Sequence, residues 1–107
     1  MLRLKNNPTL SNIQKYVEEL EIERGFKDQS ARDKCLLLGE EIGELFKAVR
    51  KSEGLNVDST SKDANISHEL ADILIYLCSI ANRFKIDLES SFREKEEINK
   101  NRTWKVN

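Results

Sequence analysis

The chain is short of turn-forming residues, with one proline and four glycines in 107 residues. An all-β domain needs a turn about every 8–12 residues, so this composition excludes one. Long apolar runs are also missing, because no stretch approaches the roughly 20 residues that a membrane-spanning helix needs. We therefore expect a protein without strands and without a membrane span.

The two cysteines, Cys35 and Cys78, lie inside helical apolar patterns. We predict buried free thiols rather than a disulfide. The net charge of −1 and the lack of a basic face make nucleic acid an unexpected partner. Residues 1–8 are too short and too polar for a secretory signal, so we expect a cytoplasmic protein.

The composition of 38% hydrophobic and 35% charged residues is typical of helices that have one buried face and one solvent-exposed face. Its length predicts one domain, residues 1–107. Apolar residues recur every three or four positions, which predicts an all-α fold with a four-helix core. We expect the helices at about residues 11–24, 31–50, 64–84 and 87–99.

Residues suited to helix ends stand at these boundaries. Ser11 and Gln14 predict a capping box at the first helix, and Gly25 fits the left-handed position after it. Ser30 and Asp87 are the expected N-caps of the second and fourth helices.

The third predicted helix is apolar on nearly every face. A helix of this kind is buried on several sides, and a chain of this size has little else with which to cover it. The sequence therefore predicts that a second copy of the chain covers part of this helix.

Five carboxylates do not fit a plain helical bundle. The second helix carries Glu40, Glu41 and Glu44, and the third carries Glu69 and Asp72. Residues three or four apart share a helix face, so Glu41 pairs with Glu44, and Glu69 with Asp72. Both pairs lie beside apolar stripes, where partial burial makes their mutual repulsion costlier. They need a positive partner.

Magnesium is the partner that this pattern favours, because it takes oxygen ligands and keeps positions open for water or phosphate. The alternative is a set of solvated acidic faces balanced by Lys47, Arg50 and Lys51. A di-iron bundle needs Glu-x-x-His on two helices. His68 directly precedes Glu69, which is the wrong spacing for iron.

Residues 38–45 (LGEEIGEL) and 68–77 (HELADILIYL) resemble the signature of the MazG-type nucleotide pyrophosphohydrolases, which is E-E-x-x-E, a variable gap, then E-x-x-D. The segment 86–89 (IDLE), followed by Lys95, Asn99, Arg102 and Trp104, is similar to the closing segment of that family. The resemblance extends over about residues 10–104.

The resemblance implies an all-α enzyme that cleaves a nucleoside triphosphate to the monophosphate and pyrophosphate with Mg²⁺, for which Mn²⁺ is a possible substitute. It implies a homo-dimer or a dimer of dimers. It makes Glu41, Glu44, Glu69 and Asp72 the metal ligands. Glu40 matches the first acid of the motif, where it would support the attacking water or a second metal, so Glu40 and Glu41 are the expected catalytic residues.

Lys95, Asn99 and Arg102 share one face at the end of the fourth helix. That face is expected to hold phosphate or sugar oxygens, although a solvated basic face explains it equally well. Trp104 would stack on a base or fill a groove in a dimer. Contributions near the mouth of the site are expected from segment 26–34, with Phe26, Lys27, Arg32 and Lys34.

The leading functional hypothesis is a house-cleaning enzyme for surplus or non-standard nucleoside triphosphates, with deoxynucleotides as the expected substrates. Relatives with the same motif would instead prefer deoxyuridine triphosphate or phosphoribosyl-ATP. A hypothesis from a different functional class is that the chain is a non-catalytic helical interaction module. Turnover separates these classes, because a binding module releases no pyrophosphate.

Overall fold

The structure is a computed structural model that describes residues 2–55 and 65–103. All regular structure in these two segments is α-helical, which confirms the all-α prediction. The helices are α1 (Leu10–Arg24), α2 (Ala31–Ser52), α3 (Ile66–Arg83) and α4 (Leu88–Lys100). They differ from the predicted bounds by at most two residues at either end, within the usual uncertainty of helix ends, and residue 64 lies outside the described segments.

The predicted ends at Gly25, Ser30 and Asp87 are confirmed. Gly25 follows α1 with a φ of 79°, a left-handed conformation that costs glycine little. Ser30 and Asp33 form a reciprocal capping box, in which the Asp33 N–H donates to the Ser30 hydroxyl at 3.1 Å. The Asp87 carboxylate accepts from the Ser90 N–H and caps α4.

The predicted capping box at Ser11 is wrong. Thr9 is the N-cap of α1, and it forms the reciprocal pair with Asn12, whose side chain accepts from the Thr9 N–H at 2.9 Å. Ser11 already lies inside the first turn, and its hydroxyl donates to Asp87 at 3.1 Å. That hydrogen bond ties the start of α1 to the start of α4.

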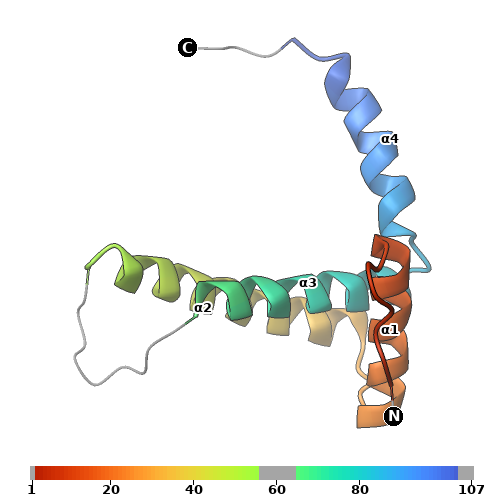
Figure 1. The fold of residues 1–107 in the computed structure, drawn as a ribbon, viewed down its shortest axis with the longest axis horizontal. Helices are drawn as coiled ribbons and strands as arrows, with labels where there is room; N and C mark the ends of the chain where they lie inside the picture. Colours follow the sequence, from red (N-terminus) through yellow and green to blue (C-terminus); the bar gives the residue numbers. More distant parts are fainter. Residues whose placement is uncertain (1, 56–64, 104–107) are drawn as a thin grey trace.

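Helices α2 and α3 lie side by side and make the most extensive helix–helix contact (Figure 1). Helix α1 crosses the end of this pair, and α4 leaves from the same end at a steep angle. The buried core sits where α1 crosses α3, around Val17, Leu20 and Cys78. This core is small, so most of α2 and α4 contributes nothing to it.

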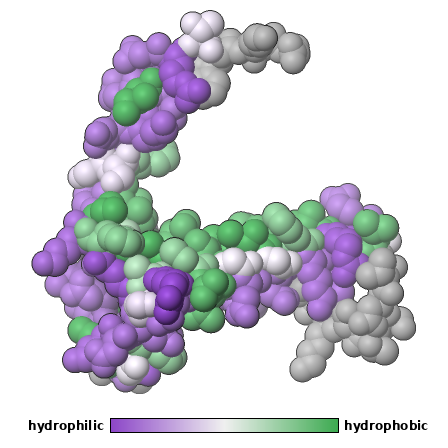
Figure 2. Space-filling view, turned by 180° about the vertical axis from the view of Figure 1, so that it is seen from behind, coloured by the Kyte–Doolittle hydropathy of each residue, from purple (hydrophilic) through white to green (hydrophobic). Residues whose placement is uncertain are grey.

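An apolar band runs along α2 and α3 on the side that faces the hollow beneath α4 (Figure 2). On α3, Leu70, Leu74 and Leu77 are exposed, and Phe46 on α2 is 68% exposed. The expectation that α3 is apolar beyond its contacts within one chain agrees with this surface. Within the described segments, no helix is both long and apolar enough to cross a membrane.

The two cysteines differ in environment. Cys78 is fully buried in the core, as predicted. Cys35 is exposed, so the prediction that it is buried is wrong. It lies near the start of α2 directly after Lys34, which is buried against Tyr76 of α3, so one side of this turn is covered and the side with Cys35 is not.

Gln14 holds the junction between α3 and α4 against α1. Its side-chain amide donates to Asn82 at 2.9 Å and to the carbonyl of Ile86, and its carbonyl oxygen accepts from the Leu88 N–H at 3.1 Å. Asn82 returns a hydrogen bond to the backbone carbonyl of Gln14 at 3.0 Å. Because Gln14 is 8% exposed, these polar groups have few other partners. Together with the Ser11–Asp87 hydrogen bond, this buried amide holds the start of α4 against α1.

We predict that Gln14→Leu lowers the free energy of unfolding by about 1–3 kcal/mol, since it removes the hydrogen-bond partner of partly buried polar groups at Asn82, Ile86 and Leu88. Urea denaturation measures this loss. Lys15→Ala, at the exposed neighbouring position, is the control and should change stability by less than about 0.5 kcal/mol. Equal effects of the two substitutions would contradict the role of Gln14.

Candidate metal and nucleotide site

Three of the predicted metal ligands meet between α2 and α3. Carboxylate oxygens of Glu41, Glu69 and Asp72 all lie within 4.8 Å of one another. Asn65 caps α3, so Glu69 lies in the first turn, where the positive end of the helix stabilises a carboxylate. Asp72 follows one turn later on the same face. Two rigid helices thus bring the three side chains together across their contact.

The site lacks positive charge of its own. None of the ion pairs within the described segments involves Glu41, Glu69 or Asp72. One oxygen of Glu41, Oε2, is buried and has no hydrogen-bond partner. Burial raises the pKa of Glu41 to about 7, together with a hydrogen bond to Glu69 and the negative charges of Asp72, Glu69 and Glu44. Such a group of oxygens fits a hard divalent cation.

The remaining two acids flank this group. Glu44 and Glu40 are both exposed on α2, and neither belongs to the set of mutually close oxygens. Their charges still reach the site. The charge of Glu44 helps to raise the pKa of Glu41. The pKa of Tyr76 is raised mainly by burial, then by the charges of Glu41 and Asp72, and to a smaller extent by the charge of Glu40.

A cavity of about 220 Å³ adjoins the carboxylates and is called here the Tyr76 pocket. It lies between α1, α2 and α3, and its lining includes Phe26, Gln29, Lys34, Asp72, Tyr76 and Ser79. Because Asp72 belongs to both, a molecule in this pocket would lie next to the carboxylate cluster.

Lys34 is almost fully buried beside this pocket. Its ammonium lies 5.1 Å from the centre of the Phe26 ring and 5.7 Å from that of Tyr76, within cation–π range. Of the residues named from segment 26–34, Phe26 and Lys34 line this pocket, and their role at the mouth of the site stays a prediction. Lys27 lines a different cavity, and Arg32 is exposed.

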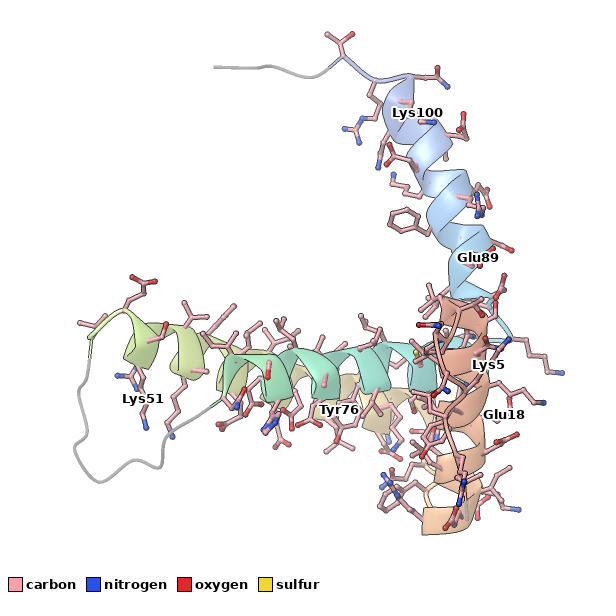
Figure 3. The ribbon with its side chains drawn as sticks, in the orientation of Figure 1. Lys5, Glu18, Lys51, Tyr76, Glu89 and Lys100 are labelled. Carbon is pink, nitrogen blue, oxygen red and sulfur yellow. The ribbon has the colours of Figure 1, made fainter. Side chains whose placement is uncertain are left out.

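The structure does not bring the predicted substrate-binding residues of α4 to the carboxylates within one chain. Lys95 lines an apolar groove with Leu74 and Leu77 of α3, whereas Asp72 lines the Tyr76 pocket. In Figure 3, Tyr76 points away from the hollow beneath α4, and Lys100 lies near the far end of α4.

Asn99 and Arg102 follow Lys95 toward that far end. Asn99 is partly buried and Arg102 is exposed. Trp104 lies outside the described residues. The roles of these residues therefore stay predictions.

Sequence reasoning missed a buried ion network behind the pocket. Glu21 pairs with Arg83 at 2.7 Å and with Lys34 at 3.4 Å, and it is 5% exposed. Burial alone would raise the pKa of Glu21, but hydrogen bonds from Arg83 and Ser79 and the nearby positive charges lower it. A signal was present, because Glu21 follows Val17 by four residues on the apolar face of α1.

We predict that stability without metal falls as pH rises, because of Glu41. Between its usual value of 4.5 and its raised pKa of about 7, the folded protein keeps a proton that the unfolded chain has lost. This contribution is present below pH 4.5 and disappears as pH rises through 7. Urea denaturation in a chelator, at pH 5 and pH 8, should show a smaller fall for Glu41→Gln than for the unmodified protein.

Magnesium at pH 8 should restore stability to the unmodified protein but not to Glu41→Gln, since binding to the folded state alone stabilises it. Identical pH dependence of the two proteins would show that Glu41 does not carry the raised pKa.

Comparison with known proteins agrees with this geometry. The family model described as MazG nucleotide pyrophosphohydrolase domain matches residues 29–106. Human dCTP pyrophosphatase 1 is 33% identical over 100 residues, covering 89% of this chain and 59% of the relative. The Bos taurus protein of the same name is 31% identical over 102 residues, covering 91% and 60%. The chain thus spans about three fifths of the length of these curated relatives. The family match includes both halves of the carboxylate cluster, and the chain belongs to the MazG nucleotide pyrophosphohydrolase family.

Proposed function

We propose that the protein hydrolyses nucleoside triphosphates to the monophosphate and pyrophosphate. The observation that carries the proposal is the cluster of Glu41, Glu69 and Asp72, which forms no ion pair with the residues that the structure describes and adjoins the Tyr76 pocket in a chain of the MazG family. Perturbed titratable groups beside a pocket are typical of catalytic sites.

Magnesium is the proposed cofactor, and manganese is the expected substitute. Glu41, Glu69 and Asp72 supply three oxygens at a spacing suited to one small ion, and the buried Oε2 of Glu41 gains the partner that it lacks. Glu44 is the proposed fourth ligand, one turn after Glu41 on α2. When bound, magnesium neutralises phosphate charge and makes the attacking water more acidic.

The carboxylates on α2 would guide the hydrolysis itself. Water attacks the α-phosphorus, the bond from that phosphorus to the bridging oxygen breaks, and pyrophosphate leaves. The proton of the water needs an acceptor. Glu40 is exposed next to Glu41 and is proposed to orient the water and take this proton.

The Tyr76 pocket is the proposed position of the nucleobase. Tyr76 and Phe26 offer aromatic faces there, and Lys34 offers a donor to an acceptor atom of the base. The relatives are named for dCTP, so deoxynucleotides come first among the substrates to test. House-cleaning of surplus or non-standard deoxynucleotides is the proposed task.

A second copy of the chain is the proposed partner. The apolar band of α2 and α3 faces the hollow beneath α4, and α4 itself exposes Phe92 by 70% and Ile98 by 50%. A two-fold dimer would cover the band of one copy with α4 of the other. The same arrangement would give Lys95, Asn99 and Arg102 of one copy a route to the phosphates bound by the other.

We predict magnesium-dependent release of pyrophosphate from at least one member of a panel of ribo- and deoxynucleoside triphosphates. Glu69→Gln should lower kcat by at least about 100-fold, since it removes a ligand charge while helix content stays unchanged. Pyrophosphate release with magnesium or with chelator measures the first, and circular dichroism the second.

The matched control is Glu89→Gln on α4, which removes an exposed carboxylate away from the site and should keep the full rate. Near-normal turnover by Glu69→Gln would refute the proposed ligand set. Magnesium-dependent stabilisation without release from any nucleotide would favour an interaction module.

We predict that the protein sediments as a dimer or a larger even assembly, and that Leu74→Lys shifts it to the monomer. The lysine would place a charge in the apolar band, where burial is costly. Ile22→Lys, on an exposed site of α1 outside the band, is the control and should leave the assembly intact. A monomer before any substitution would contradict this proposal.

A further inference from the structure

The guanidinium of Arg83 binds across the back of the Tyr76 pocket. Nε donates to the Gln29 carbonyl at 2.6 Å, and Nη2 donates to the Phe26 carbonyl at 3.0 Å. Nη1 and Nη2 both donate to the Glu21 carboxylate, at 3.0 and 2.7 Å. Nη1 also donates to the carbonyl and hydroxyl of Ser79. Every nitrogen of the guanidinium therefore has a protein partner.

These partners are themselves part of the pocket. Glu21, Phe26, Gln29 and Ser79 all line it, whereas Arg83 lines the neighbouring cavity on the other side of that wall. With its nitrogens already bonded and its position behind the wall, Arg83 is not placed to bind a substrate in the pocket. Its contacts instead join one end of α3 to α1 and to the segment between α1 and α2.

Arg83 makes the hydrogen bonds that attach segment 25–30 to α3, beside the cation–π contacts of Lys34 with Phe26 and Tyr76. The other hydrogen bonds of this segment within the described residues stay local, since the Phe26 N–H donates to the carbonyl of Glu21 and the Gln29 N–H to that of Phe26. Ser30 bonds only within the first turn of α2. Arg83 supplies the hydrogen bonds that fix the carbonyls of Phe26 and Gln29 relative to the helix carrying Asp72 and Tyr76.

We propose that Arg83, anchored by Glu21, is the positioning residue for the base-recognising wall of the pocket. It keeps Phe26 and Gln29 at a fixed distance from Tyr76, so it sets the affinity for the base and leaves the chemistry at the carboxylates unchanged. This inference rests on the proposed function, because it assigns the Tyr76 pocket to the nucleobase.

The test uses Arg83→Met, which removes the hydrogen bonds to segment 25–30 and leaves the buried Glu21 carboxylate paired with Lys34. Kinetics are compared on a deoxynucleoside triphosphate and on deoxyribose 5′-triphosphate, which lacks a base. We expect KM for the nucleotide to rise at least about tenfold, with kcat nearly unchanged and no effect on the baseless substrate. Arg83→Lys should restore part of the affinity, since it keeps the charge but loses the fork of donors.

The matched control is Arg93→Met, which removes an exposed arginine on α4 and should leave both substrates unaffected. An equal loss on both substrates, or a loss confined to kcat, would overturn the positioning role, because it would indicate general structural damage or a role in the chemistry.

Amide hydrogen exchange tests the same inference without turnover. The Gln29 N–H should exchange faster in Arg83→Met, while amides in the middle of α2 keep their protection. Unchanged exchange at Gln29 would overturn the inference. If the unmodified protein released no pyrophosphate from any nucleotide, the proposed function would fail, but the exchange result would still decide whether Arg83 holds the segment.

Discussion

The repulsion among carboxylates between α2 and α3 is the constraint on which the rest of the site depends. The two helices pack against each other along most of their length, and this contact brings Glu41 close to Glu69 and Asp72. Without a cation, burial and like charge raise the pKa of Glu41 to about 7. The arrangement opposes stability at neutral pH in the absence of metal, and the divalent cation proposed for this site would offset that effect. Strained electrostatics of this kind are characteristic of functional sites.

A second buried carboxylate in the same chain, that of Glu21, has a lowered pKa instead of a raised one. Glu21 is buried at 5% exposure, but Arg83 and Lys34 surround it, and its pKa is lowered. Both acids lie near the Tyr76 pocket, yet one is fully compensated by protein cations and the other is not. Glu21, which is paired with Arg83 and Lys34, lines the pocket as part of its wall. Glu41 has an oxygen without a hydrogen-bond partner among the described residues, and this oxygen is available to a ligand. This contrast distinguishes Glu21 from the proposed metal ligand Glu41 more clearly than burial alone does.

The small core has consequences for assembly. Packing around Val17, Leu20 and Cys78 holds α1 against α3, but it leaves leucines of α3 and Phe46 of α2 exposed. Gln14 fixes the start of α4 so that the helix projects away from this surface. A single chain therefore presents both an apolar band and an unpacked helix, which is the pattern expected of a subunit that is completed by a partner.

The sequence by itself determined the helices, their ends at Gly25, Ser30 and Asp87, and the faces that carry Glu41, Glu69 and Asp72, because periodicity and capping are local properties. It failed at Ser11, where Thr9 competed for the same capping role, and at Cys35, because an apolar pattern does not show which side of a helix its neighbours cover. Only the tertiary structure decided that Glu44 lies outside the tight carboxylate group, that Lys95 faces an apolar groove, and that Glu21 meets Arg83. These relations join residues far apart in the chain, and packing between helices sets them.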